Sequence, residues 1–207
     1  LFPEQLTYIV NHAEDEVIFC DTSLWSILEP LMPTFTTLKH LVFMNDGKGE
    51  MPKSVPGVQV HEYESLLAAA KPVEWRVDDE NQAASMCYTS GTTGNPKGVV
   101  YSHRSTFLHT MAEMVADSIG IRESDTVLPV VPMFHVNAWG LTHAAATCGA
   151  NLVMPGPDLS GKAIADHIVN EKVTVGAGVP TIWMAVLPEL KGRDTKSLRA
   201  IVCGGAA

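Results

Sequence analysis

One stretch of the chain combines the residue types that hold a polyphosphate: Tyr88-Thr89-Ser90-Gly91-Thr92-Thr93-Gly94-Asn95-Pro96-Lys97-Gly98. Its glycines allow backbone N–H groups to turn toward a ligand, because no Cβ stands in the way. Four of its residues add hydroxyl donors: Thr89, Ser90, Thr92 and Thr93. The ammonium group of Lys97 supplies a positive charge for phosphate oxygens. The stretch therefore predicts a phosphate-binding loop.

The spacing of this loop differs from that of other phosphate-binding motifs. A Walker A loop requires a hydroxyl residue directly after its lysine, whereas Lys97 is followed by Gly98. The kinase signatures HRD and DFG do not occur in the sequence. A flexible linker is the alternative explanation for so many small residues. The apolar segments on both sides of the loop, and a single lysine beside Pro96, argue against a linker.

A second group of candidate residues follows an apolar segment in the middle of the chain. The tetrapeptide Pro132-Met133-Phe134-His135 places a histidine there, and Trp139 follows four residues later. At the period of an α-helix, this spacing predicts that His135 and Trp139 share one face of a short helix. The alternatives are a structural histidine and a core tryptophan, which need no ligand.

The other histidines and the cysteines do not indicate a metal site. Four histidines lack ligand spacing with carboxylates or cysteines, which predicts structural or surface roles: His103, His109, His143 and His167. The four cysteines stand far apart without a CxxC pair: Cys20, Cys87, Cys148 and Cys203. Their apolar or small neighbours predict buried, reduced thiols, which are typical of a cytoplasmic protein.

The elements that position these residues alternate between strand and helix. Short apolar runs predict strands at residues 17–20, 40–44, 85–89, 98–101, 126–131, 151–154, 173–175 and 198–203. Helical spacing and capping residues predict helices at 6–13, 23–31, 63–70, 102–119, 138–147 and 160–171, and another from Pro180. Ser23 and Ser102 are the expected caps of two of them. This order predicts an α/β fold with mainly parallel sheets flanked by helices.

Composition and charge exclude several classes of protein. Lys and Arg number 14 and Asp and Glu number 23, which gives a formal net charge of −9. Such an acidic chain lacks the positive surface of a general nucleic-acid binder. No uninterrupted apolar run is long enough to span a bilayer, and the chain opens without the basic segment of a secretory signal. We therefore expect no nucleic-acid partner, no transmembrane segment and a cytoplasmic location.

The glycine-rich loop and its continuation, Val99-Val100-Tyr101-Ser102-His103-Arg104, resemble the phosphate-binding loop of the adenylate-forming (AMP-binding) superfamily. This group comprises acyl-CoA synthetases, firefly-type luciferases and peptide-synthetase adenylation domains. Three further segments fall in the order of the superfamily: residues 132–139, 176–181 and 202–207. The likeness is strongest to medium- and long-chain fatty-acid–CoA ligases.

The resemblance implies a domain organisation. The chain would be part of the large N-terminal domain of an acyl-CoA synthetase-like fold. Residues 1–82 would be an α/β segment of that domain with a surface loop, and residues 83–207 its ATP- and acyl-binding part, truncated before the C-terminal domain. The opening Leu1 and a last predicted strand without a following helix also lead us to expect a fragment.

The resemblance implies a two-step reaction. Such enzymes join a carboxylate to ATP, which gives an acyl-adenylate and pyrophosphate, and then transfer the acyl group to coenzyme A. ATP and Mg²⁺ would be bound, with coenzyme A as co-substrate. The implied ATP-binding residues are Thr89, Ser90, Gly91, Thr92, Thr93, Gly94, Lys97, Val136, Trp139 and Gly205. The hydroxyl of Thr89 would help hold Mg²⁺, and Lys97 would close the loop on the phosphates.

The resemblance also assigns the acyl side of the site. His135 would lie near the acyl carboxylate and the α-phosphate and orient the nucleophile, so it and Lys97 are the implied catalytic residues. No general base is needed, because a carboxylate is ionised at neutral pH. Trp139 would gate the acyl tunnel. The remaining implied acyl-binding residues are small: Gly178, Gly204 and Ala206. Small residues at strand ends can also serve packing alone.

Several hypotheses about function stay open on the sequence. The second Mg²⁺ ligand, the ribose-binding aspartate, the hinge and the catalytic lysine of the superfamily are not among these 207 residues, so we expect the isolated chain to be inactive. The acid is a fatty acid in the leading hypothesis. 3-Methylmercaptopropionate or another short acid is the alternative within the same chemistry. A non-catalytic nucleotide- or acyl-binding module is the alternative of another class. The expected partners are small molecules, with a homodimer as one expectation for the complete enzyme.

Overall fold

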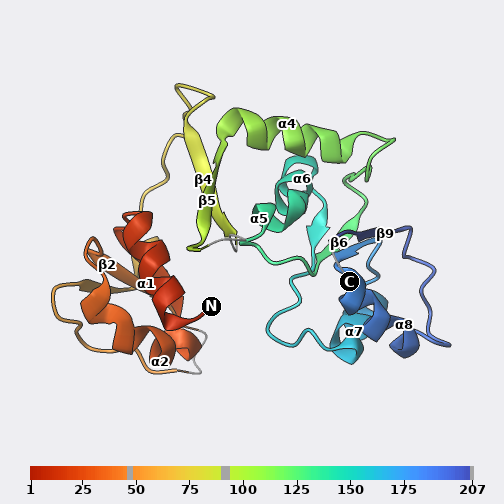
Figure 1. Ribbon diagram of the computed structural model, residues 1–207. Coiled ribbons are helices and arrows are strands. Elements are labelled where there is room, and N and C mark those ends of the chain that lie inside the picture. Colours follow the sequence, from red (N-terminus) through yellow and green to blue (C-terminus); the bar gives the residue numbers. More distant parts are fainter. Residues whose placement is uncertain (46–48, 90–93, 206–207) are drawn as a thin grey trace. The chain divides into compact units, whose positions relative to one another are not determined.

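The computed structural model describes residues 1–45, 49–89 and 94–205 of the chain. These residues form two compact units (Figure 1). The first comprises Leu1–Arg76 and Thr89–Gly98, and the second comprises Val77–Tyr88 and Val99–Ala207. Parallel sheets with helices packed against them confirm the predicted α/β class.

The first unit is built on a three-stranded parallel sheet with the order β1-β2-β3. Its strands are β1 (Val17–Asp21), β2 (His40–Met44) and β3 (Gln59–Glu62). Its helices are α1 (Pro3–His12), η1 (Thr22–Leu24), α2 (Trp25–Leu28), η2 (Glu29–Thr34) and α3 (Tyr63–Ala69). One face of the sheet forms a core with Cys20, Leu41, Phe43 and Val55.

Two expectations for this unit were wrong in detail. The single helix predicted at residues 23–31 is a short α-helix between two 3₁₀ segments, because Pro30 and Pro33 lack the N–H groups that a longer helix needs. The cap of the first 3₁₀ segment, η1, is Asp21 instead of the predicted Ser23. The Asp21 side chain accepts the backbone N–H of Ser23. Strand β3 was not predicted, because its alternating polar residues give no apolar run.

The second unit contains a four-stranded parallel sheet with the order β7-β6-β8-β9. Its strands are β6 (Thr126–Pro129), β7 (Asn151–Leu152), β8 (Val175–Gly178) and β9 (Ala200–Cys203). Its helices are α4 (His103–Met114), α5 (Val136–Trp139), α6 (Leu141–Cys148), α7 (Gly161–Asn170) and α8 (Pro180–Glu189). Figure 1 shows α7 and α8 packed side by side. Among the described residues, no helix is long and apolar enough to cross a membrane.

Both faces of the four-stranded sheet are covered by apolar clusters. Val127 packs on one face with Leu141 and Ala144 of α6, whereas Leu128 packs on the other with Ile164 and Val186 of α7 and α8. Covering both faces explains why these strands read as continuous apolar runs. The helices α7 and α8 approach so closely that a Cβ at position 161 would lie 2.1 Å from the Ala185 carbonyl oxygen, and this contact requires glycine.

Strands β4 (Ala83–Thr89) and β5 (Lys97–Ser102) pair as a separate two-stranded sheet. Ser102 then caps α4 as predicted, because its hydroxyl accepts the backbone N–H of Ser105 at 3.1 Å. The helix ends at Met114 instead of reaching residue 119, since Val115 adopts an extended conformation with φ −67° and ψ 135°.

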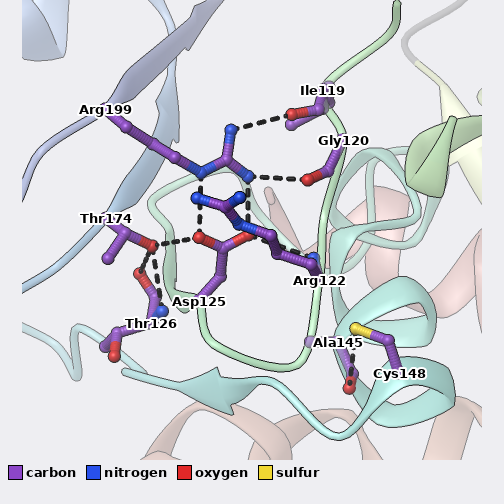
Figure 2. A network of polar contacts seen from close by, with 9 residues as sticks. All are labelled: Ile119, Gly120, Arg122, Asp125, Thr126, Ala145, Cys148, Thr174 and Arg199. Atoms are coloured by element: carbon purple, nitrogen blue, oxygen red, sulfur yellow. Dashed lines mark hydrogen bonds and ion pairs between the residues drawn. The ribbon is translucent and has the colours of Figure 1, made fainter. Parts of the chain in front are cut away.

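A polar network closes the amino end of the four-stranded sheet (Figure 2). Asp125, Thr174 and Arg199 directly precede β6, β8 and β9. The Asp125 carboxylate accepts hydrogen bonds from Arg199 at 2.9 and 2.5 Å and from the Thr174 hydroxyl at 2.8 Å. The guanidinium group also donates to the carbonyls of Ile119 and Gly120. Hydrogen bonds from Arg199 above all lower the pKa of Asp125 to about 2, although its side chain is buried.

Candidate functional site

The described ends of the glycine-rich loop have the features expected of a phosphate site. Thr89 ends β4 with a half-buried side chain, and Lys97 begins β5 with an exposed side chain. Gly94 has a φ of +113°, which L-residues with a Cβ rarely adopt, and open space surrounds it. Pro96, which directly precedes Lys97, is buried. Its ring restricts the backbone φ angle just before the lysine. Four predicted loop residues lie outside the described part of the chain: Ser90, Gly91, Thr92 and Thr93.

The segment after His135 is a left-handed turn. The φ angles of Val136, Asn137, Ala138 and Trp139 are 49°, 49°, 54° and 55°. The prediction of an ordinary short helix carrying His135 and Trp139 was therefore wrong, since His135 lies before the turn in an extended conformation. Left-handed backbone costs about 1–2 kcal/mol per residue with a Cβ, except that asparagine tolerates it better. Such strain persists only where the surroundings enforce it.

Strand β4 holds the turn from one side through Asn137. The Asn137 side-chain amide donates to the Ser85 hydroxyl at 3.0 Å. Its carbonyl oxygen lies 3.5 Å from the Cys87 sulfur, which donates to it. Ser85 and Cys87 are two residues apart in β4, so their side chains lie on the same face of that strand.

Helix α4 holds the turn from the other side through His109. The Nε2 atom of His109 lies 3.1 Å from the Trp139 carbonyl oxygen, which accepts its hydrogen bond. It also lies 3.3 Å from Oε1 of Glu113, one helical turn further along α4. Gly140 follows with a φ of +76°, and a Cβ there would lie 2.4 Å from the His109 ring. Position 140 therefore requires glycine for two separate reasons.

A small cavity of about 220 Å³ lies between α4 and this turn. Its lining includes Thr106, His109, Asn137 and His143. Burial raises the pKa of the nearby Glu113, and the facing His109 partly offsets that rise. Three buried polar atoms in this region have no hydrogen-bond partner: Thr106 Oγ1, Glu113 Oε2 and His143 Nδ1. Ordered water is the usual partner of such atoms in a polar cavity of this size.

The carboxyl end of the four-stranded sheet brings Trp139 onto the glycine turn after β9. A Cβ at position 204 would lie 3.3 Å from the tip of the Trp139 ring, so Gly204 leaves room for that ring. Gly205 has a φ of +90° and faces Val179. Gly178 ends β8 opposite Cys203, and its carbonyl accepts the indole N–H of Trp183 at 3.1 Å. Trp183 therefore occupies the space beside Gly178, and Ala206 lies outside the described residues.

The structure thus brings together only some of the predicted site residues. Trp139 and Gly204 are neighbours, and the exposed His135 precedes the turn that carries the tryptophan. Thr89 and Lys97 belong to the first unit, whereas His135 and Trp139 belong to the second. The sequence analysis missed Asn137 as a functional candidate, because an asparagine in an apolar segment carries no motif. The available signal was a polar residue between Val136 and Ala138, in a segment otherwise rich in apolar residues.

The four cysteines differ in exposure, and their burial was predicted only in part. All four cysteines are free, but Cys203 is exposed and Cys148 is only half-buried, so the prediction of four buried thiols was wrong for these two. Residues 148 and 203 lie at a helix end and a sheet edge, where neighbouring apolar letters do not ensure burial. Within the described ranges, no three His, Cys, Asp or Glu residues cluster as a metal site.

Comparison with known proteins extends over the whole chain. The family model described as AMP-binding enzyme matches residues 1–207. The chain is 47% identical over 209 residues to the 3-methylmercaptopropionyl-CoA ligase of Ruegeria lacuscaerulensis, covering 100% of the chain and 39% of that protein. It is 44% identical to the medium-chain-fatty-acid–CoA ligase of Ectopseudomonas oleovorans, covering 100% of the chain and 38% of that relative.

A solved structure with a bound adenylate shares the fold. The anthranilate CoA ligase AuaEII in complex with anthranoyl-AMP superposes with a TM-score of 0.81 at 23% identity, over 100% of this chain and 39% of that one. The chain spans about two fifths of the length of these relatives. The family match over all residues confirms the resemblance seen in the glycine-rich loop, and the chain belongs to the AMP-binding enzyme family.

Proposed function

We propose that the polypeptide carrying this chain is an acid–CoA ligase that first makes an acyl-adenylate from ATP and then an acyl-CoA. The observation that carries the proposal is the Trp139 ring against Gly204 at the carboxyl end of a parallel sheet, with the exposed His135 directly before the turn that ends at Trp139. Open α/β sheets bind their ligands at that end. The names of the relatives, all acid–CoA ligases, support the same chemistry.

The residues of the loop fit a nucleotide triphosphate with Mg²⁺. Lys97 is exposed, the position of Gly94 has open space, and the Thr89 hydroxyl is a hard oxygen donor of the kind that Mg²⁺ prefers. Ser90 to Gly94 would wrap the β- and γ-phosphates. Thr89 would help hold the metal ion, which when bound would neutralise phosphate charge. Lys97 would stabilise the same charge from the protein side.

The acyl side of the proposed site orients a nucleophile that is already charged. His135 would hold the carboxylate in line with the α-phosphate, and positioning of this kind can contribute much of the rate enhancement. Trp139 would limit the space open to the acid, because its ring already fills the room above Gly204. Val136 and Gly205 would lie along the nucleotide.

We propose a fatty acid as the substrate, with 3-methylmercaptopropionate as the second candidate. The 44% identity to a medium-chain and to a long-chain fatty-acid–CoA ligase supports the first. The 47% identity to the Ruegeria lacuscaerulensis ligase favours the second. The cytoplasmic location, the homodimer and the inactivity of the isolated chain stay predictions.

Carboxylate-dependent exchange of pyrophosphate into ATP tests the proposal directly. The complete polypeptide that carries these 207 residues would be assayed with acids from acetate to palmitate and with 3-methylmercaptopropionate. We expect exchange to require an acid and to fall about 100-fold in Lys97→Ala, whereas the exposed Lys196→Ala should match wild type. Nucleotide binding without exchange for any acid would favour a non-catalytic module.

A further inference from the structure

The left-handed turn at Val136–Trp139 is the most strained described segment of the candidate site. Four consecutive residues with a Cβ have positive φ angles, and one of them, Ala138, is fully buried. His135 precedes the turn and Trp139 ends it. Contacts that hold this turn in place therefore also hold His135 and Trp139, the two side chains that would contact the acid.

Asn137 is suited in two ways to fix the turn. It is the residue of the four whose type tolerates left-handed backbone. Its side chain also reaches across to β4, donating to the Ser85 hydroxyl at 3.0 Å and accepting from the Cys87 thiol at 3.5 Å. Ser85 and Cys87 are half-buried and buried, so these hydrogen bonds are largely shielded from water.

The strand at the other end of this tether leads directly into the glycine-rich loop. Ser85 lies four residues before Thr89, where β4 ends. The opposite side of the turn is fixed independently, because His109 binds the Trp139 carbonyl and excludes any side chain at position 140. The turn is thus held between α4 and β4, and Asn137 supplies the β4 side.

We propose that Asn137 is a positioning residue for the acid: its amide ties the turn to β4 and thereby places His135 and Trp139 for adenylation. This inference rests on the proposed function. Asn137 itself acts through the turn and needs no contact with the substrate. Loss of the tether should therefore weaken use of the acid much more than binding of ATP, because the proposed phosphate contacts of Lys97 lie outside the turn, and only Val136 and Trp139 of the turn would lie against the nucleotide.

The test compares four variants of the complete polypeptide in pyrophosphate exchange. Asn137→Gly removes the tether but keeps the left-handed backbone accessible, and Ser85→Ala removes only the partner hydroxyl. We expect Asn137→Gly to raise the KM for the acid about tenfold, because it removes the hydrogen bond to Ser85 and the weaker one from Cys87, with the KM for ATP within about twofold of wild type. Asn137→Asp should recover most of the loss, because its carboxylate can accept from both Ser85 and Cys87. Asn170→Gly, at the exposed end of α7, is the matched control.

The double variant Ser85→Ala/Asn137→Gly makes the test specific. Because one hydrogen bond joins the two side chains, their effects on the acid KM should be less than additive. Additive effects, or an Asn137→Gly enzyme with the wild-type acid KM, would overturn the proposal. Equal rises in the KM values for acid and ATP would also overturn it, because they would indicate a general structural role.

Amide hydrogen exchange separates this proposal from the proposed function. If the wild-type polypeptide shows no acid-dependent exchange of pyrophosphate, the ligase proposal fails while the tether can still be measured. The backbone amides of residues 136–140 should then exchange faster in Asn137→Gly than in wild type. Unchanged amide exchange at these residues would contradict the tether itself.

Discussion

The two ends of the four-stranded parallel sheet are built in opposite ways. At the amino end, Asp125, Thr174 and Arg199 satisfy one another through short hydrogen bonds, and the carboxylate is 1% exposed. At the carboxyl end, His135 is exposed and the backbone after it is strained. The same strands β6, β8 and β9 connect both ends.

This difference indicates that the amino end of the sheet stabilises the fold, whereas the carboxyl end leaves space for a ligand. A buried carboxylate is tolerated only because its charge is paired and its lone pairs are used. At the other end, the glycines after β9 and the exposed His135 bury less surface, as is common where a substrate must enter. We therefore expect substitutions at the amino end to change stability and those at the carboxyl end to change activity.

Asp125→Ala should give the largest effect on the free energy of unfolding. The substitution leaves the Arg199 guanidinium and the Thr174 hydroxyl without their main acceptor, which we expect to cost about 3 kcal/mol. Urea denaturation of the complete polypeptide would measure the loss, with catalytic constants of the folded fraction unchanged. Asp166→Ala is the matched control, because its ion pairs with Lys162 and Arg193 lie at the solvent-exposed surface and should contribute far less to stability than the Asp125 network. Equal losses in both variants would remove the distinction between the two ends.

Acid titration should sharpen the same contrast. The pKa of Asp125 in the folded protein is about 2, below its ordinary value of 3.8, so the unfolded state binds this proton first. The contribution of Asp125 is complete above about pH 5 and is lost as the pH falls toward 2, by about 2 kcal/mol in total. The difference in unfolding free energy between wild type and Asp125→Asn should therefore shrink as the pH falls from 5 to 2.5. A difference that is constant with pH would contradict the pKa shift.

Gly204→Ala should give the smallest change in stability and a measurable change in specificity. The new Cβ would lie 3.3 Å from the Trp139 ring, so the ring must move by a few tenths of an ångström. We expect the preferred chain length of the acid to shift, with rate changes of several-fold and a loss of stability below about 1 kcal/mol. Gly204→Val should enlarge the shift in the pyrophosphate-exchange profile. An unchanged profile in both variants would separate Trp139 from the choice of acid.

Much of the fold could be predicted from the sequence, because buried parallel strands are short apolar runs. The strands around Val127 and Ile201 were predicted for this reason, whereas the strand predicted at residues 173–175 lies at Val175–Gly178 and overlaps the prediction only at Val175. Strand β3 was not, because Gln59 and His61 make its pattern polar and only pairing with β2 identifies it. Local periodicity does not contain that long-range pairing.

The candidate site residues could be proposed from the sequence, whereas the backbone that carries them could not be predicted. The types of Lys97, His135 and Trp139 and their order along the chain indicated the chemistry. The left-handed turn could not be predicted, because Val136 and Trp139 individually disfavour positive φ and only contacts with β4 and α4 enforce it. The tether to Ser85 joins residues 52 positions apart, and a single sequence does not indicate such a contact.

The polar network at the amino end has a consequence for the order of folding. Asp125 and Arg199 are separated by 74 residues, so their contact closes a long loop and carries a large entropic cost. In the folded sheet β8 lies between β6 and β9, so the positions of both side chains depend on its pairing with these two strands. The ion pair should therefore form late in folding, once the strands have paired. It should act mainly by lowering the unfolding rate.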